Sequence, residues 1–312
     1  MGDVRSIHSL PEHPRPEPYQ SVARASGPRL RPYVLGWAGF RAPAGAEQPT
    51  RMLPLNAATL IVDFTAMRAI VTGPRAAATL WPYSLWRHGV AVGLTPAGMS
   101  ALLGVPMREV AGTAVPLEDL LGGVRAEELT GRLVETASWA GRFGALERWL
   151  AASLAAEPVA TLALGPTAAP APALPAVPLT APAEAPAAPT AWSRGGAGAG
   201  IADGLVMYAW WRLQEPAGPR TVEALAGELG VSRRYLELGF RRVVGLSPKT
   251  VARVARFQRA VRTLSRPSAM LSEAVACGYA DQPHLTREIR AMTAMTPKQL
   301  FAFVQDTERL AH

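Results

Sequence analysis

Arginine and lysine side chains gather in one stretch of this 312-residue sequence. Between Arg220 and Arg262 there are ten basic and three acidic residues, and residues 201–312 carry +6 (16 basic minus 10 acidic) of the net +8. Guanidinium and ammonium groups at this density bind polyanions, and DNA, RNA and an anionic membrane surface are the candidates. From charge alone, a solvated face without a partner is the alternative.

The stretch after Gly230 predicts a helix that presents part of this charge. Gly230 accepts the left-handed conformation that ends a preceding helix, and Ser232 is a residue type that caps the next one. Leu236, Phe240 and Val244 recur at four-residue steps and predict an inward face. The outward face then holds the polar and charged residues and one leucine: Arg233, Arg234, Glu237, Leu238 and Arg241. A short helix, a tight turn and a helix with a basic outer face form the helix-turn-helix pattern.

The same pattern returns 49 residues further along the chain. Ser232 corresponds to Asp281, another capping residue, and Ser247-Pro248-Lys249 corresponds to Thr296-Pro297-Lys298, where proline again takes the first helical position. Between the two units, residues 249–264 predict a connecting helix about 24 Å long at 1.5 Å per residue. Such a helix would space two reading helices near one turn of duplex, which is about 34 Å.

Residues 201–306 resemble the DNA-binding domain of the AraC/XylS regulators. Five stretches carry the resemblance: Val231-Ser232-Arg233-Arg234-Tyr235-Leu236, Phe240-Arg241-Arg242, Gly245-Leu246-Ser247-Pro248-Lys249, Arg256-Phe257-Gln258-Arg259-Ala260 and Ala276-Cys277-Gly278-Tyr279-Ala280-Asp281-Gln282-Pro283-His284-Leu285-Thr286-Arg287-Glu288. The last stretch, followed by Thr296-Pro297, is the most specific. The resemblance implies a sequence-specific transcription regulator with two helix-turn-helix units. Residues 29–121 are more weakly similar to the β-rich sensor domains that precede this module in one branch of the family.

The resemblance implies that each second helix reads base edges from its exposed face. The implied base-reading residues are Arg234, Glu237 and Leu238 in the first unit and Gln282, His284 and Arg287 in the second. Arginine pairs with guanine, glutamine with adenine, and glutamate accepts from cytosine N4, whereas Leu238 offers only apolar contact. The candidates for phosphate contacts, which position a protein without specifying sequence, are Arg233, Arg241, Arg256, Thr286 and Arg290.

Several of these residues have plainer explanations. Arg233 and Arg234 could simply be solvated near a helix start, and His284 could lie on a helix surface without touching a base. Cys277, the only cysteine, excludes an intrachain disulfide and is expected to pack as a small apolar side chain. Glu273 stands where the family buries an aliphatic side chain, and burying an unpaired carboxylate is costly. Either this helix is shifted, or Glu273 finds a partner or the surface.

The first half of the chain predicts a β-rich domain with helices. Short apolar runs rich in β-branched residues predict strands at 33–35, 59–64, 69–72 and 90–94. Thr95-Pro96 predicts the start of a short helix. Residues 125–156 have helical periodicity, with an expected break at Gly141 and Gly144. This helical pair is either a dimerisation surface or packing for its own domain.

Composition sets the expected boundaries. Residues 157–200 are nearly all Ala, Pro, Thr and Gly, which predicts a semi-stiff linker between two independent domains. The expected fold class is an α+β, β-rich sensor-like domain followed by an all-α domain with two helix-turn-helix units. In chain order we expect a flexible arm at 1–28, the sensor-like domain with its helical pair at 29–156, the linker at 157–200, the AraC-type DNA-binding domain at 201–306 and a tail at 307–312.

Catalytic and metal-binding patterns are absent from the sequence. His8, His13 and His88 are the only histidines before residue 200, and they lack metal-ligand spacing. No Gly-rich phosphate loop, nucleophile elbow or metalloprotease motif occurs. We therefore expect no enzyme activity, no metal and no cofactor. Aromatic side chains that could line an effector pocket, or equally form plain core, are Trp37, Phe64, Trp81 and Trp86.

The expected partners are double-stranded DNA, RNA polymerase if the protein is an activator, a small-molecule effector and a second copy of the chain. A polar, proline-rich start and the lack of a long apolar run predict a cytoplasmic protein without membrane contact. Two other classes remain open. A nonspecific architectural protein would bind every duplex with the same salt-sensitive affinity. An enzyme in residues 29–121 with an accessory DNA-binding domain would need a pocket with convergent polar groups.

Overall fold

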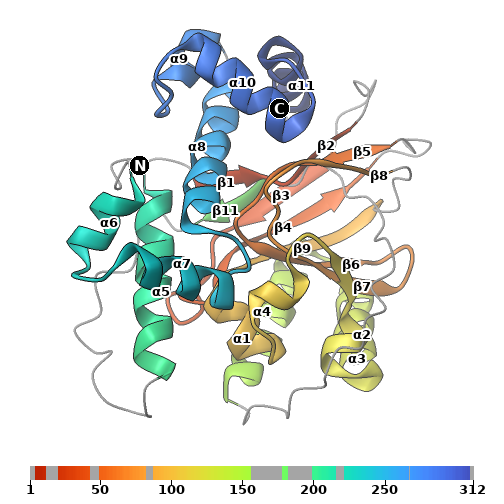
Figure 1. Ribbon diagram of the computed structural model, residues 1–312. Helices are drawn as coiled ribbons and strands as arrows, with labels where there is room; N and C mark the ends of the chain where they lie inside the picture. The colour runs from red at the N-terminus through yellow and green to blue at the C-terminus, as the bar shows by residue number, and fades with distance from the viewer. Residues whose placement is uncertain are drawn as a thin grey trace.

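The computed structural model describes residues 4–11, 20–42, 49–81, 87–155, 178–181, 199–215, 221–266 and 268–309. An N-terminal part built on β-sheets, with helices on one side, is followed by a C-terminal part made of helices (Figure 1). This arrangement confirms the expected fold class. No helix in the described ranges combines the length and the apolar character needed to cross a membrane.

The largest sheet has six strands, all antiparallel, in the order β10-β7-β6-β9-β4-β3. Its strands are β3 (Gln20–Arg24), β4 (Val34–Arg41), β6 (Ala58–Asp63), β7 (Arg68–Thr72), β9 (His88–Leu94) and β10 (Ala114–Pro116). The central strand β6 is buried along its whole length, so both faces of the sheet centre are covered. That explains why β6 has a continuous apolar run in place of an alternating pattern.

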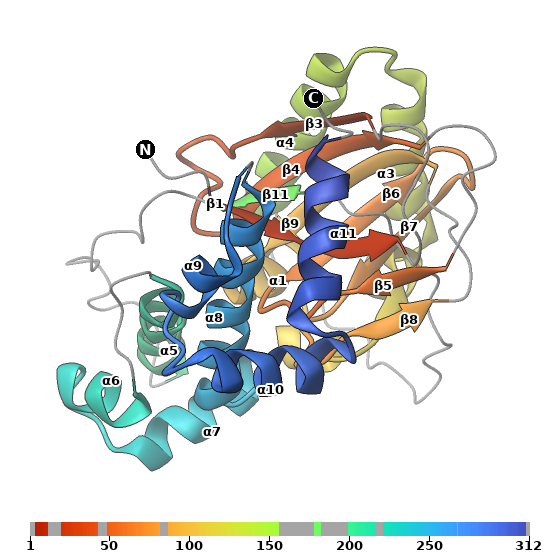
Figure 2. The same ribbon diagram turned by 90° about the horizontal axis from the view of Figure 1, so that it is seen from above.

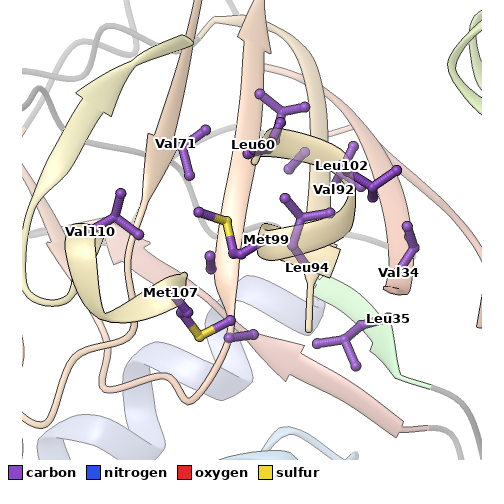
Figure 3. Packing of buried hydrophobic residues seen from close by; sticks show 14 of the residues in the cluster. Val34, Leu35, Leu60, Val71, Val92, Leu94, Met99, Leu102, Met107 and Val110 are labelled. Atoms are coloured by element: carbon purple, nitrogen blue, oxygen red, sulfur yellow. The ribbon is translucent and has the colours of Figure 1, made fainter. Parts of the chain in front are cut away.

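Helices cover one face of this sheet. They are α1 (Pro96–Leu103), a 3₁₀ helix (Met107–Val110), α2 (Leu117–Leu121), α3 (Gly123–Glu135) and α4 (Trp139–Ala155). Thr95 caps α1 as expected, because its hydroxyl accepts from the Gly98 backbone N–H at 3.0 Å. Figure 3 shows Met99 and Leu102 of α1 packed among strand residues such as Leu60. The helical face and the sheet therefore share one apolar core.

The expected break between α3 and α4 was misplaced. The chain leaves the helix at residues 136–138, and both Gly141 and Gly144 lie inside α4. Ser138 accepts a hydrogen bond from the Gly141 N–H at 3.1 Å, as a residue that starts a helix does. A Cβ at Gly141 would lie 2.7 Å from the Thr136 methyl group, so this glycine permits a tight turn and does not end a helix.

Short strands from distant parts of the chain form two smaller sheets. β2 (Ser9–Pro11), β5 (Thr50–Met52) and β8 (Thr79–Trp81) make a three-stranded sheet, and β1 (Val4–Ile7) pairs with β11 (Pro178–Ala181). The structure thus places three strands, β1 to β3, where a flexible arm was expected, and one strand within the expected linker. Local sequence missed β1, β2 and β11 because their pairing partners are remote, and β3 because it is an exposed edge strand without an apolar alternation.

The described C-terminal helices are α5 (Ala199–Gln214), α6 (Val222–Glu228), α7 (Arg233–Val243), α8 (Pro248–Ser265), α9 (Leu271–Val275), α10 (Gln282–Thr293) and α11 (Pro297–Arg309). The pairs α6–α7 and α9–α10 are the two helix-turn-helix units, and α8 connects them. Helices α5 and α11 both pack on α8. Figure 2 shows α7 and α10 along the same edge of the molecule.

The two parts of the chain pack against each other, in contrast to the expected independent domains. Helix α8 lies against β1, α11 against β2, and α7 against the 3₁₀ helix. Leu10 and Leu53, from the N-terminal part, belong to the same buried cluster as Phe257 of α8 and Ile289 of α10. The second helix-turn-helix unit therefore completes its core with N-terminal side chains.

Candidate nucleic-acid interface

The first helix-turn-helix unit has the caps that its sequence predicts. Gly230 has a φ of 65°, in the left-handed region, and the Ser232 hydroxyl accepts from the Tyr235 N–H at 3.1 Å. Leu236 and Phe240 of α7 are fully buried. The start and the inward face of α7 are thus fixed by local chemistry.

The second unit repeats this construction 49 residues later. Asp281 accepts from the His284 N–H at 2.6 Å, and Leu285 and Ile289, which correspond to Leu236 and Phe240, are fully buried. The helix that follows each unit, α8 or α11, is capped as well. Ser247 accepts from the Thr250 N–H at 3.1 Å, and Thr296 from the Gln299 N–H at 3.2 Å.

The outward face of α7 is exposed and partly ion-paired. Arg234 is exposed without a described partner, whereas Arg233 pairs with Glu223 of α6 at 2.8 Å. Glu237 is half-buried and pairs with Arg241, one turn later, at 3.0 Å. Both members of this pair were expected to contact DNA, so DNA must compete with an existing salt bridge.

Two exposed side chains give the face of α7 an apolar patch. Leu238 is 57% exposed and Tyr235 is 40% exposed. Tyr235 was not among the expected DNA-contacting residues, although it corresponds to His284 at the 49-residue repeat. In the same register Leu238 corresponds to Arg287. The alignment of the two units was therefore the signal that could have identified Tyr235.

The outward face of α10 is more polar. Gln282 and Arg287 are exposed, and His284 is half-buried. The His284 Nδ1 accepts from the Ala280 backbone N–H at 3.2 Å, and its ring lies edge-on to Tyr279 with 5.4 Å between centroids. Because Nδ1 accepts, the ring proton of neutral His284 resides on Nε2, which leaves this group as a donor.

The expected phosphate contacts divide into two sets. Arg233, Arg241 and Arg290 are exposed and Thr286 is half-buried, so all four lie on or near the outer surface. Arg256, in contrast, is engaged inside the domain. Its guanidinium donates to Glu288 at 3.0 Å and lies 5.2 Å from the Tyr279 ring centroid.

Glu288 of α10 joins the two helices α8 and α10. It accepts from Arg253 at 2.8 Å as well as from Arg256, and its side chain is 14% exposed. Burial raises the pKa of Glu288, but the hydrogen bonds from Arg256 and Arg253 outweigh that effect and hold the pKa below its usual range. This ion pair holds α10 on α8 and engages the guanidinium that was expected to contact a phosphate.

The carboxylate of Glu273 has hydrogen-bond partners and lies partly at the surface. Its carboxylate accepts from the Met270 N–H at 2.9 Å, at the start of α9, and from Arg266 at 2.7 Å. The side chain is 39% exposed. The Glu273 carboxylate is therefore paired and partly solvated, so this departure from the expected pattern has little cost in stability.

The N-terminal part donates hydrogen bonds to the C-terminal ends of both second helices. Arg108 donates to the Arg242 carbonyl of α7 at 2.7 Å, and Arg51 donates to the Thr293 carbonyl of α10 at 3.1 Å. The Ala78 N–H donates to Met292 of α10 at 2.6 Å. The last carbonyls of a helix have no partner within it, so these donors satisfy them. Sequence analysis missed these contacts because each joins residues more than a hundred positions apart.

Helix α8 is also held by residues of the N-terminal part. Asn56 donates to the Val251 carbonyl at 2.9 Å, and Gln258 donates to the Pro54 carbonyl at 2.7 Å. Both bonds are buried. Together with the bonds at the helix ends, they tie the connecting helix and both second helices to the N-terminal part.

The structure describes the surroundings of two of the four expected effector-pocket residues, Trp37 and Phe64. Trp37 is fully buried in the core, and Phe64 is 8% exposed and lies near His88. Trp81 is the last residue of β8, and Trp86 lies outside the described residues. Among the residues that the structure describes, no group of three or more His, Cys, Asp or Glu side chains could hold a metal ion.

One family of known proteins matches the part of the chain that holds both units. A family described as a helix-turn-helix domain matches residues 225–302, which contain both α7 and α10. A transcriptional regulator with an AraC-type DNA-binding domain from Chromobacterium violaceum is 28% identical, with 32% of this chain and 88% of that chain covered and a TM-score of 0.28. No curated protein matches the chain.

Two solved structures of ToxT from Vibrio cholerae align over most of the chain. An apo variant covers 97% of this chain and 98% of its own, with 8% identity and a TM-score of 0.41. The form bound to an unsaturated fatty acid covers 97% of each chain, with 8% identity and a TM-score of 0.37.

The fold and the site define a class of protein: a DNA-binding transcription regulator. Its DNA-binding part is a helix-turn-helix domain, which residues 225–302 form with their two capped second helices.

Proposed function

We propose that this regulator reads two successive major grooves of one DNA site with α7 and α10. The carrying observation is that both helices have a capping side chain at the same position and buried apolar side chains at the same two positions. The single helix α8, of 18 residues, joins them. At 1.5 Å per residue α8 is about 27 Å long. That length suits two helices placed near one turn of duplex, about 34 Å apart.

The proposed base-reading groups differ between the helices. On α10, Gln282 suits adenine, Arg287 suits guanine, and the Nε2–H of His284 can donate to an acceptor such as guanine O6. On α7, Arg234 supplies the polar contact, and Leu238 meets a thymine methyl group. We therefore infer that the second unit carries more sequence information than the first.

Glu237 is proposed to read a base only after it leaves Arg241. A carboxylate can accept from cytosine N4, and the released Arg241 can then contact a phosphate. Arg233, Thr286 and Arg290 are proposed as further phosphate contacts. Arg256 is proposed as a positioning residue, since Glu288 and Tyr279 hold it.

We infer that the N-terminal part controls the orientation of α7 and α10. The support is that Arg108 and Arg51 donate to the ends of both helices while Asn56 holds α8. An effector that moved these donors would change the relative placement of the two reading helices. In this proposal the chain acts in the cytoplasm without catalysis of its own, as a monomer or a homodimer, and recruits RNA polymerase if it activates.

Footprinting of the full chain on a bound duplex tests the proposal. We expect two protected blocks about ten base pairs apart on one side of the duplex. The double variant Gln282→Ala, Arg287→Ala should lose one block and keep the other. Arg148→Ala, which removes an exposed charge from α4, is the matched control and should leave both blocks. Uniform protection of any duplex would instead indicate a nonspecific DNA-binding protein.

A further inference from the structure

Two guanidinium groups converge on one imidazole at the edge of the N-terminal domain. Arg41 ends β4 and lies opposite His88, which begins β9. The His88 Nε2 accepts from Arg142 of α4 at 3.0 Å and from Arg41 at 3.3 Å. Because Nε2 accepts from both, the proton of neutral His88 lies on Nδ1. Burial, and then the charges of Arg41 and Arg142, lower the pKa of His88 to about 4, so the ring is neutral near pH 7.

No carboxylate from the described part of the chain joins this cluster. Arg142 is only 5% exposed, and its other hydrogen bond goes to the Leu133 carbonyl at 3.2 Å. Among the described residues, no carboxylate pairs with Arg41 or Arg142. Burial, together with the charge of Arg41, lowers the pKa of Arg142. Two cations held together and partly removed from water are destabilising unless an anion joins them.

Aromatic rings border the same cluster. The Arg142 guanidinium lies 4.4 Å from the Phe64 ring centroid and 4.9 Å from that of Trp139. His88 meets both rings edge-on, at 5.0 Å and 5.5 Å. Trp139 lies directly over Gly39, where a Cβ would come within 2.4 Å of the indole. This glycine thus lets the indole lie flat on the sheet.

The cluster is accessible from solvent on one side. Arg41 is exposed, and His88 and Trp139 are half-buried, whereas Arg142 and Phe64 are buried behind them. A ligand can therefore approach the open side with an anionic group toward the guanidiniums and an apolar body against Trp139. A bare inorganic anion would use only the charges, and a neutral aromatic compound only the rings.

We propose that Arg41, Arg142, His88 and Trp139 form a binding site for a small aromatic carboxylate. The carboxylate accepts from the two guanidiniums, and the ring of the ligand packs on Trp139. The alternative is that the two arginines only brace α4 on the sheet. The site deepens the proposed control by an effector, and in that respect rests on the proposed function. Binding at the site itself can be measured without DNA.

Isothermal titration calorimetry of the full chain with benzoate tests the site. Benzamide, which has the same shape without the charge, and inorganic phosphate are the comparison ligands. We expect benzoate to bind and the other two to bind at least tenfold more weakly, since charge-assisted hydrogen bonds contribute about a factor of ten or more. Equal binding of benzamide, equal or tighter binding of phosphate, or no binding of benzoate would each overturn the proposal.

Matched variants locate the binding. Arg41→Gln removes an exposed guanidinium at the site and should weaken benzoate about tenfold. Arg148→Gln removes an exposed charge from the same helix as Arg142 and should leave the affinity unchanged. Trp139→Phe should abolish most of the benzoate-induced change in tryptophan fluorescence. If Arg41→Gln and Arg148→Gln weaken benzoate equally, the anion is bound by general charge and the site is disproved.

Discussion

Single side chains decide how much sequence information each half of the DNA-binding surface can carry. The sequences of the two units align at a shift of 49 residues. This alignment places Leu238 at the position of Arg287 and Tyr235 at that of His284. Arginine and histidine offer hydrogen bonds to base edges, whereas an exposed leucine offers only apolar contact. We therefore expect the second unit to select its bases more strictly than the first, although both use the same capped scaffold.

We predict that Arg287→Ala costs about 1–3 kcal/mol of binding free energy and relaxes base preference at one position. The measurement is competition binding with duplexes that carry each of the four bases at each position of the site. Arg290→Ala, one turn away on the same helix, is the control. It should weaken every duplex alike and reduce the salt dependence of log K by about 1. A uniform loss for Arg287→Ala would make it a phosphate contact.

Local chemistry made the helices of the C-terminal domain predictable. Ser232 and Asp281 cap α7 and α10, and each hydrogen bond spans three residues, so the sequence alone contains both partners. The strands β1, β2 and β11 could not be predicted in this way, since their partners are remote in sequence. The ion pair of Arg256 with Glu288 was missed for the same reason, because the two residues lie 32 positions apart.

At the scale of the elements, the ion-pair cluster of Glu288 with Arg253 and Arg256 fixes α10 on α8. The folded-state pKa of Glu288 is lowered, so its contribution to stability is complete above the unfolded pKa of about 4.3 and is lost as the pH falls through the folded-state value. We predict that Glu288→Gln lowers the free energy of unfolding by about 1–3 kcal/mol at pH 7. The difference from the parent protein should shrink below about pH 4.

Chemical denaturation between pH 3 and pH 7 measures this effect. Glu223→Gln, which removes an exposed partner of Arg233, is the control and should change stability by less than about 1 kcal/mol. A difference between Glu288→Gln and the parent that does not depend on pH would show that the carboxylate charge is not what holds α10.

At the scale of the whole molecule, the N-terminal and C-terminal parts are one packed unit. Leu10 and Leu53 complete the core around α8 and α10, and buried bonds from Asn56 and Gln258 cross the same boundary. A signal in the sheet can therefore reach both reading helices through direct contacts. The sequence did not reveal this docking, because a proline-rich segment between two periodic regions is equally typical of independent domains.

We predict that Leu53→Ala destabilises the DNA-binding domain, although Leu53 lies more than two hundred residues from α10. The side chain is fully buried, and such a truncation costs about 2–5 kcal/mol. Hydrogen exchange should accelerate in α10 as well as in the sheet. Leu80→Ala, at a 45% exposed position of β8, should change stability by less than about 0.5 kcal/mol. Faster exchange confined to the sheet would mean that the two parts fold independently.

We infer that α7 and α10 of one chain together select one DNA sequence. Selection of the full chain against random duplex DNA, followed by sequencing, tests it most directly. We predict enrichment of an asymmetric site with two conserved blocks about ten base pairs apart, the block read by α10 being the more strongly conserved. Binding without any enriched sequence, or no binding to duplex DNA, would contradict this account.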